Sequence, residues 1–134
     1  MIRNAKVRRT VTVLGSALLA VVLLPAGSER IVEAAPTNSE SCLPGDLRQK
    51  LNQVRARFGS ISVVSSYRPG ARIAGSGRVS LHASCRAVDF RPNGASLNQV
   101  AAWLRQNHHG GLGIYPCMNH IHIDNGPSVQ WTRC

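Results

Sequence analysis

The feature that most constrains the fold is an alternation of ionisable and apolar residues in the stretch NHIHIDNGP. His120, His122 and Asp124 stand at alternate positions, with Ile121 and Ile123 between them. Successive side chains of a β-strand point to opposite faces. The alternation therefore predicts a strand that buries two isoleucines and presents two imidazoles and a carboxylate on its other face. That polar face is either solvated or part of a site.

The first 35 of the 134 residues are ordered like a secretory signal. Four basic residues and no acid lie in 1–9, and an uncharged apolar run follows over 10–24. The run is shorter than the roughly 20 residues of a membrane-spanning helix. We expect a signal peptide over 1–35, or an N-terminal anchor if it is not cleaved, then a linker over 36–41 and one domain over 42–134. The protein would be exported to the periplasm or cell envelope.

The chain is strongly basic, with a formal net charge of +10. Residues 1–35 hold five of its 16 basic and two of its 6 acidic residues, so 11 and 4 remain and the net charge is +7. Such a surface attracts polyanions. In an exported protein these would be cell-wall polymers or anionic lipid head groups, whereas nucleic acid does not fit the compartment. Simple solubility is the alternative explanation of the charge.

The predicted domain contains four cysteines: Cys42, Cys85, Cys117 and Cys134. An even number in a small exported domain predicts two disulfides. No two cysteines have CxxC spacing, so a cysteine-based zinc site is not supported. Four cysteines allow three pairings and the sequence does not choose among them; our preference is Cys42–Cys85 with Cys117–Cys134.

Hydrophobic periodicity predicts two helices, the first beginning near Asp46 and ending at Gly59, the second capped by Ser96 and ended by the Gly110–Gly111 pair. Short runs rich in β-branched residues predict strands at 60–66, 87–90, 112–115 and 120–124. Between them, residues 69–80 form a long loop rich in Gly, Ser and Arg, and loops of this length are usually functional. We therefore expect an α+β fold with a small antiparallel sheet flanked by helices.

Only four side-chain carboxylates remain in the predicted mature part, namely Glu40, Asp46, Asp89 and Asp124. Asp46 suits a helix start, and Glu40 lies in the linker. Asp89 and Asp124 are flanked by apolar residues on predicted strands, where a carboxylate is costly unless a cation or several donors satisfy it. An arginine or a metal ion could do so.

The five histidines divide into two groups. His108 and His109 end the second predicted helix, where a positive charge suits the helix dipole, and we interpret them as structural. His82 and His122, taken with Asp89, would supply two imidazoles and one carboxylate. That set with one open position is what a catalytic zinc requires. A solvated or ion-paired face is the alternative.

Several motifs occur in an order that resembles one family. SLHASCRAVDF at 80–90 resembles the S-x-H-x-x-G-x-A-x-D motif of zinc D-alanyl-D-alanine carboxypeptidases and murein endopeptidases, with Cys85 where the family usually has glycine. SSYRP at 65–69 resembles the strand that ends in a substrate-binding arginine. GGLGIYP, HIHIDNGP and Trp131 are similar to the second half of a small exported branch. The similarity covers residues 42–134 and implies the small antiparallel sheet that this family shares with hedgehog signalling domains.

The resemblance implies Zn²⁺ held by His82, Asp89 and His122, and a peptidase acting on peptidoglycan peptides. Where many family members have a general-base glutamate, this chain has Asn119, which cannot take a proton. The resemblance gives His120 the role of general base or of stabilising the oxyanion, as in the His-x-His pair of murein endopeptidases. A histidine that only supports the ligands or is merely exposed is the alternative.

The resemblance further implies that Arg68 orients the substrate, because a guanidinium binds carboxylates through paired hydrogen bonds. Neutralising an aspartate is the alternative role for this arginine. Asp124 would support an imidazole ligand or form a salt bridge, and Ser80 would lie beside the ligands as part of the first motif. We expect a monomer. The rival hypotheses are a zinc-containing wall-binding module without catalysis and a metal-free, disulfide-stapled interaction protein.

Overall fold

The computed structural model describes residues 35–134, so the predicted signal and its cleavage site lie almost wholly outside the described residues. The elements, in chain order, are α1 (Gly45–Phe58), β1 (Ile61–Ser65), the 3₁₀ helix η1 (Leu81–Ser84), β2 (Ala87–Pro92), α2 (Leu97–Asn107), β3 (Leu112–Tyr115), the 3₁₀ helix η2 (Pro116–Met118), β4 (His120–Asp124) and β5 (Gln130–Thr132). Within the described residues, no helix combines the length and the apolar character that a membrane crossing requires.

The five strands form one sheet in the order β1-β2-β4-β3-β5. All neighbours are antiparallel except β3 and β5, which run parallel. The predicted α+β class with a small sheet is confirmed, and so are both helices and the four predicted strands. β5 was not expected from the sequence, because its three residues are too few to show a period. The parallel pairing of β5 with β3, which makes the sheet mixed, was therefore not expected either.

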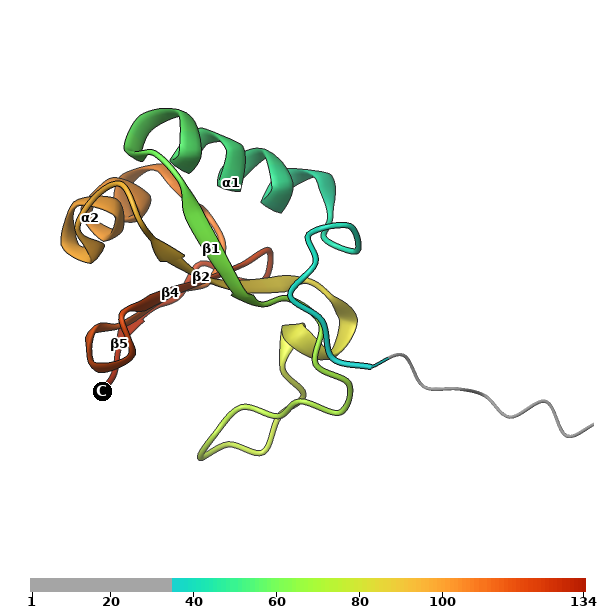
Figure 1. Ribbon diagram of the computed structural model, residues 1–134. Coiled ribbons are helices and arrows are strands. Elements are labelled where there is room, and N and C mark those ends of the chain that lie inside the picture. The colour runs from blue at the N-terminus through green and yellow to red at the C-terminus, as the bar shows by residue number, and fades with distance from the viewer. Residues whose placement is uncertain (1–34) are drawn as a thin grey trace, which may run out of the picture. The chain divides into compact units, whose positions relative to one another are not determined.

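One face of the sheet carries the hydrophobic core, and both helices lie over that face (Figure 1). The alternation predicted for residues 120–124 is confirmed, because Ile121 and Ile123 are fully buried in this core. The core also takes apolar residues from β2, β3 and both helices, among them Phe90, Leu112 and Leu104. The opposite face of the central strands is left for polar side chains, and the candidate site lies there.

Local signals explain where the helices begin and end. Ser96 accepts a hydrogen bond from the amide of Gln99, whose side chain accepts one from the Ser96 amide, so α2 starts with a complete capping box. In α1 the Asp46 carboxylate accepts from the Leu47 amide. Gly59 follows the last turn of α1 with a φ of 86°, a left-handed conformation that glycine adopts without strain.

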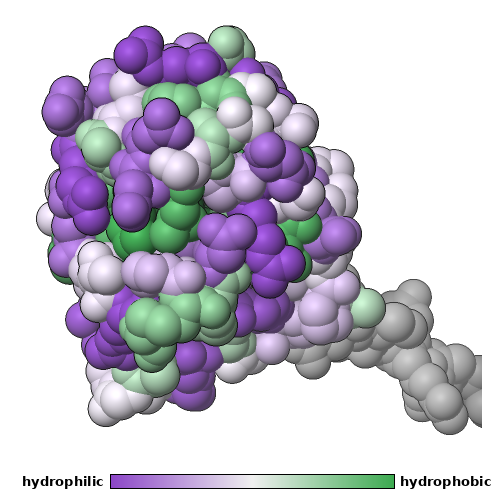
Figure 2. Space-filling model, turned by 60° about the vertical axis from the view of Figure 1, so that its left-hand side comes forward, coloured by the Kyte–Doolittle hydropathy of each residue, from purple (hydrophilic) through white to green (hydrophobic). Residues whose placement is uncertain are grey.

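The long loop over residues 69–80 folds back on itself and extends away from the helices (Figure 1). Arg72 and Val79 pair across it, and both ends of the loop lie close to η1, because the Arg68 amide donates to the His82 carbonyl. Hydrophilic side chains cover most of the molecular face in Figure 2, with smaller apolar areas between them. This distribution agrees with the basic composition of the chain.

Two disulfides are present, Cys42–Cys85 and Cys117–Cys134, which is the pairing preferred in the sequence analysis. The segment expected to be a linker, residues 36–41, is tied to the domain. Its Thr37 pairs with Tyr67 after β1, and the side chain of Glu40 forms an ion pair with Arg55 of α1. The first disulfide anchors the end of the same segment.

Candidate metal centre

Three buried side chains from separate segments meet on the polar face of the sheet. Asp89 in β2 and His122 in β4 are directly opposite each other in the antiparallel register. His82 comes from η1, which precedes β2. Their exposed fractions are 0% for His82, 7% for Asp89 and 8% for His122. The ligand set predicted from the sequence is therefore brought together in the folded chain.

The distances within this cluster fit a tetrahedral metal ion. His82 Nε2 lies 3.2 Å from His122 Nδ1 and 3.2 Å from Asp89 Oδ1, and His122 Nδ1 lies 2.8 Å from Asp89 Oδ1. Tetrahedral zinc with ligands at 2.0–2.1 Å would separate ligand atoms by about 3.3 Å. Two imidazole nitrogens and one carboxylate oxygen also match the donor set of catalytic zinc sites, which keep a fourth position open.

Each histidine in the cluster has its second ring nitrogen held by the protein. His82 Nδ1 donates to the carbonyl of Ser66 at 2.7 Å, which leaves Nε2 free to act as a ligand. The orientation of His82 is also supported from its backbone, because the Ser80 hydroxyl accepts from the His82 amide at 3.3 Å. Ser80 thus holds the start of η1 and does not contact the cluster through its own hydroxyl.

Asp124 holds the other imidazole. Its Oδ2 accepts from His122 Nε2 at 3.1 Å, so His122 Nδ1 faces the cluster. Its Oδ1 accepts from the amides of Gly111 and Gly126 at 2.9 and 2.8 Å. A Cβ on Gly111 would lie 2.3 Å from the Asp124 carboxylate, so only glycine leaves room for it there. Gly111 belongs to the glycine pair that the sequence predicted to end the second helix. It therefore has a second role, which is to leave room for this carboxylate.

The pKa values show that the cluster favours a positive charge. Burial alone would raise the pKa of Asp89, but hydrogen bonds from His122 and His82 outweigh it and hold this pKa well below its usual range. Burial alone would lower the pKa of His122, but its hydrogen bonds to Asp124 and Asp89 raise it. The two carboxylates thus stabilise a cation between them, and that cation can be a proton or a metal ion.

Arg68 lies on the rim of the cluster. Its Nη2 is 3.7 Å from Asp89 Oδ2, while the two histidines face Oδ1 of the same carboxylate. The Arg68 side chain is 48% exposed, so the remaining donors of its guanidinium face solvent. This position is compatible with both roles weighed from the sequence, namely neutralising Asp89 and binding a substrate oxygen.

His120 forms a wall of the site together with two aromatic residues that the sequence analysis did not assign to it. Its imidazole stacks on Tyr115, with ring centroids 4.6 Å apart, and burial lowers its pKa. The Trp131 indole donates to the Tyr115 hydroxyl at 2.9 Å and lies 5.3 Å from the His122 ring. Gly113 makes room for the indole, because a Cβ there would lie 2.5 Å from it. Asn119 is exposed at the turn before β4.

His108 is a structural residue, as predicted, but the predicted reason, a positive charge at the end of the helix, was wrong. The residue follows α2, but its side chain is buried, and burial lowers its pKa. Its Nε2 donates to the carbonyls of Asp124 and Gly111 at 3.0 and 3.2 Å. His108 is therefore a structural residue behind Asp124, and its neutral form is favoured.

Comparison with known proteins shows which family the chain is similar to. A family model described as Peptidase M15 matches residues 26–124. A probable peptidoglycan L,D-endopeptidase MepK of Haemophilus influenzae is 31% identical over 106 residues, which cover 71% of this chain and 57% of that protein. The peptidoglycan L,D-endopeptidase MepK of Escherichia coli K12 is 32% identical over 78 residues, covering 53% of this chain and 43% of that protein.

The chain thus spans about half the length of the curated relatives it matches. No solved structure gave a match. The family match covers most of the chain, including all three clustered side chains, and it confirms the resemblance stated from the motifs. The chain belongs to the peptidase M15 family.

Proposed function

We propose that this protein is an exported zinc peptidase that hydrolyses amide bonds in the stem peptides of peptidoglycan. The observation that carries the proposal is the buried cluster of His82, Asp89 and His122, whose spacing fits zinc and whose remaining polar atoms are held by the protein. The M15 relatives named for peptidoglycan endopeptidase activity support the substrate class. Zinc itself is inferred from the donor set.

When bound, zinc would polarise the scissile carbonyl and lower the pKa of a water molecule in its open position. The chain's own residues then supply positioning and proton transfer. The imidazole of His120 lies two strand positions from His122, about 7 Å along β4 and on the same face. Because burial lowers its pKa, it is neutral at pH 7 and can accept a proton from the attacking water and pass it to the leaving amine.

Arg68 would bind an oxygen of the substrate through the donors that do not face Asp89. The aromatic wall of Tyr115 and Trp131 would hold the peptide on the opposite side and restrict water around His122. Two disulfides and the basic surface suit a protein that works outside the cytoplasm against an anionic wall. The named relatives favour internal cleavage over removal of a terminal residue.

Incubation of the zinc-loaded protein with purified muropeptides, followed by mass spectrometry, tests the proposal. We expect products whose masses identify the cleaved bond, with cleavage at an L,D-bond within the stem peptide. The His120→Ala variant should bind zinc but yield at least 100-fold less product. Intact muropeptides despite one bound zinc per chain would favour the rival hypothesis of a wall-binding module.

A further inference from the structure

The segment that precedes α1 makes two separate connections to η1, the 3₁₀ helix that carries His82. We call residues 37–42 the strap. Its first contact is with the chain just after β1, where Thr37 and Tyr67 exchange amide-to-carbonyl hydrogen bonds at 2.9 and 3.2 Å. The strap therefore continues the backbone pairing beyond the end of β1.

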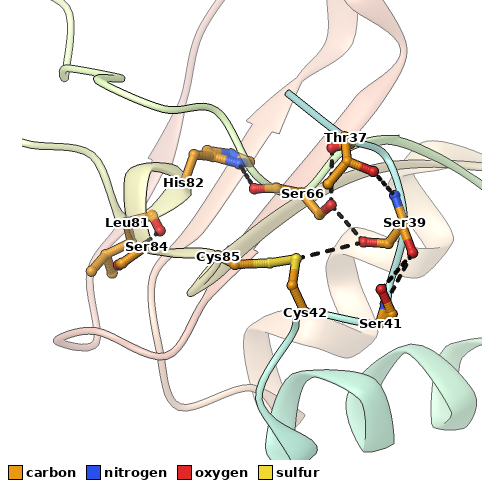
Figure 3. The surroundings of a disulfide bond; sticks show 9 residues. All are labelled: Thr37, Ser39, Ser41, Cys42, Ser66, Leu81, His82, Ser84 and Cys85. Atoms are coloured by element: carbon orange, nitrogen blue, oxygen red, sulfur yellow. Dashed lines mark hydrogen bonds between the residues drawn. A yellow bond between two sulfur atoms is a disulfide. The ribbon is translucent and has the colours of Figure 1, made fainter. Parts of the chain in front are cut away.

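Ser66 is the first connection between the strap and His82 (Figure 3). Its side chain is fully buried, and its hydroxyl lies 2.9 Å from the Thr37 carbonyl and 2.6 Å from the Ser39 carbonyl, donating toward both. The carbonyl of Ser66 accepts from His82 Nδ1 at 2.7 Å. One buried residue thus contacts both the strap and the ring of a predicted metal ligand.

The Cys42–Cys85 disulfide is the second connection (Figure 3). Cys85 ends η1, three residues after His82, and its amide donates to the carbonyls of His82 and Leu81. Its φ of 54° lies in the left-handed region, which costs free energy for a residue other than glycine. The disulfide holds this residue where the turn that carries His82 needs it.

We propose that the strap positions His82 for metal binding, with Ser66 as a positioning residue and the Cys42–Cys85 disulfide as its anchor. This inference rests on the proposed metal site. Ser66 fixes which nitrogen of His82 carries the proton, and the disulfide fixes the turn on which the ring is carried. Metal affinity is sensitive to such supports, since loss of an outer hydrogen-bond partner typically weakens binding by about 10- to 100-fold.

The experiment compares zinc dissociation constants, measured by competition with a chromophoric chelator. Ser66→Ala removes the hydroxyl but keeps the carbonyl that accepts from His82, and Ser62→Ala, on exposed β1 surface, is its matched control. Cys42→Ser/Cys85→Ser removes the anchor, and Cys117→Ser/Cys134→Ser removes the disulfide remote from the strap. The absorption spectrum of bound Co²⁺ adds a readout of ligand geometry.

We expect zinc binding to weaken by more than about twofold in Ser66→Ala and in the Cys42/Cys85 variant, with an altered Co²⁺ spectrum. The loss in Ser66→Ala should stay below the roughly tenfold typical of losing a hydrogen-bond partner, because the carbonyl that accepts from His82 remains. Both controls should stay within about twofold of the wild type. Equal affinities in all variants, or equal losses in the two disulfide variants, would overturn the inference. If the Cys42/Cys85 variant does not fold, Ser66→Ala decides alone.

This outcome is separate from that of the proposed function, because zinc binding is measured whether or not muropeptides are cleaved. A wild type that binds zinc but cleaves nothing would refute the peptidase and leave the strap's role intact. A wild type that binds no zinc would overturn both proposals.

Discussion

Asp124 gives the sharpest test of how the proposed metal centre is held. Its two oxygens have different partners, since Oδ1 accepts from two glycine amides and Oδ2 accepts from His122 Nε2. In Asp124→Asn the amide oxygen must face the glycine amides, because an NH₂ group cannot accept from them. The amide NH₂ then faces His122 and donates to Nε2. This moves the ring proton to Nδ1, the nitrogen that faces Asp89.

A protonated Nδ1 cannot bind a metal ion, so zinc affinity should fall by about 10- to 100-fold, which corresponds to about 1.4–2.7 kcal/mol. The metal-free protein should lose less than about 3 kcal/mol of unfolding free energy, because the hydrogen bonds to the glycines are retained. Competition titration gives the affinity and urea unfolding the stability. Asp46→Asn, at the exposed start of α1, is the control. Zinc affinity within threefold of wild type in Asp124→Asn would refute this account of His122.

Three further predictions concern other parts of the molecule. Arg68→Gln should raise KM for muropeptides more than it lowers kcat, whereas Arg57→Gln on the exposed side of α1 should change neither; equal kinetics for the two variants would exclude Arg68 from substrate binding. Cys117→Ser/Cys134→Ser should lower the unfolding free energy in urea by about 3 kcal/mol, because that disulfide closes a loop of 17 residues, and an unchanged midpoint would contradict this. Burial lowers the pKa of His108, so this residue binds a proton more readily in the unfolded chain than in the folded chain. The contribution of His108 to stability is therefore full above pH about 6.5 and is lost as the pH drops below that value. His108→Gln should remove this part of the pH dependence of urea midpoints measured from pH 5 to 8.

Much of the fold follows from local patterns. The spacing of Leu47, Leu51 and Val54 places all three on the buried side of α1, and the alternation in 120–124 fixes which face of β4 carries the histidines. Both patterns depend only on how often apolar residues recur along a helix or a strand, and a single sequence shows this directly. The same reasoning placed Asp89 and His122 on strands, although it could not show that the strands are neighbours.

What the sequence did not reveal depends on contacts between distant segments. The role of Ser66 arises because the chain after β1 passes between the strap and η1, and no local pattern marks it. Trp131 joins the site only through the parallel pairing of β5 with β3, and that register is set by the whole sheet. The space that Gly111 leaves for the Asp124 carboxylate likewise depends on where β4 lies in the folded sheet.

The most direct test of the central claim is muropeptide hydrolysis measured against zinc occupancy. The protein is stripped with a chelator, zinc is returned in steps from zero to two equivalents, and the rate is followed by mass spectrometry beside the His122→Ala variant. The account predicts no activity without metal, a rate that rises linearly to one zinc per chain and then stays constant, and no recovery in the variant. Hydrolysis that persists after the metal is removed, or full recovery in His122→Ala, would contradict it.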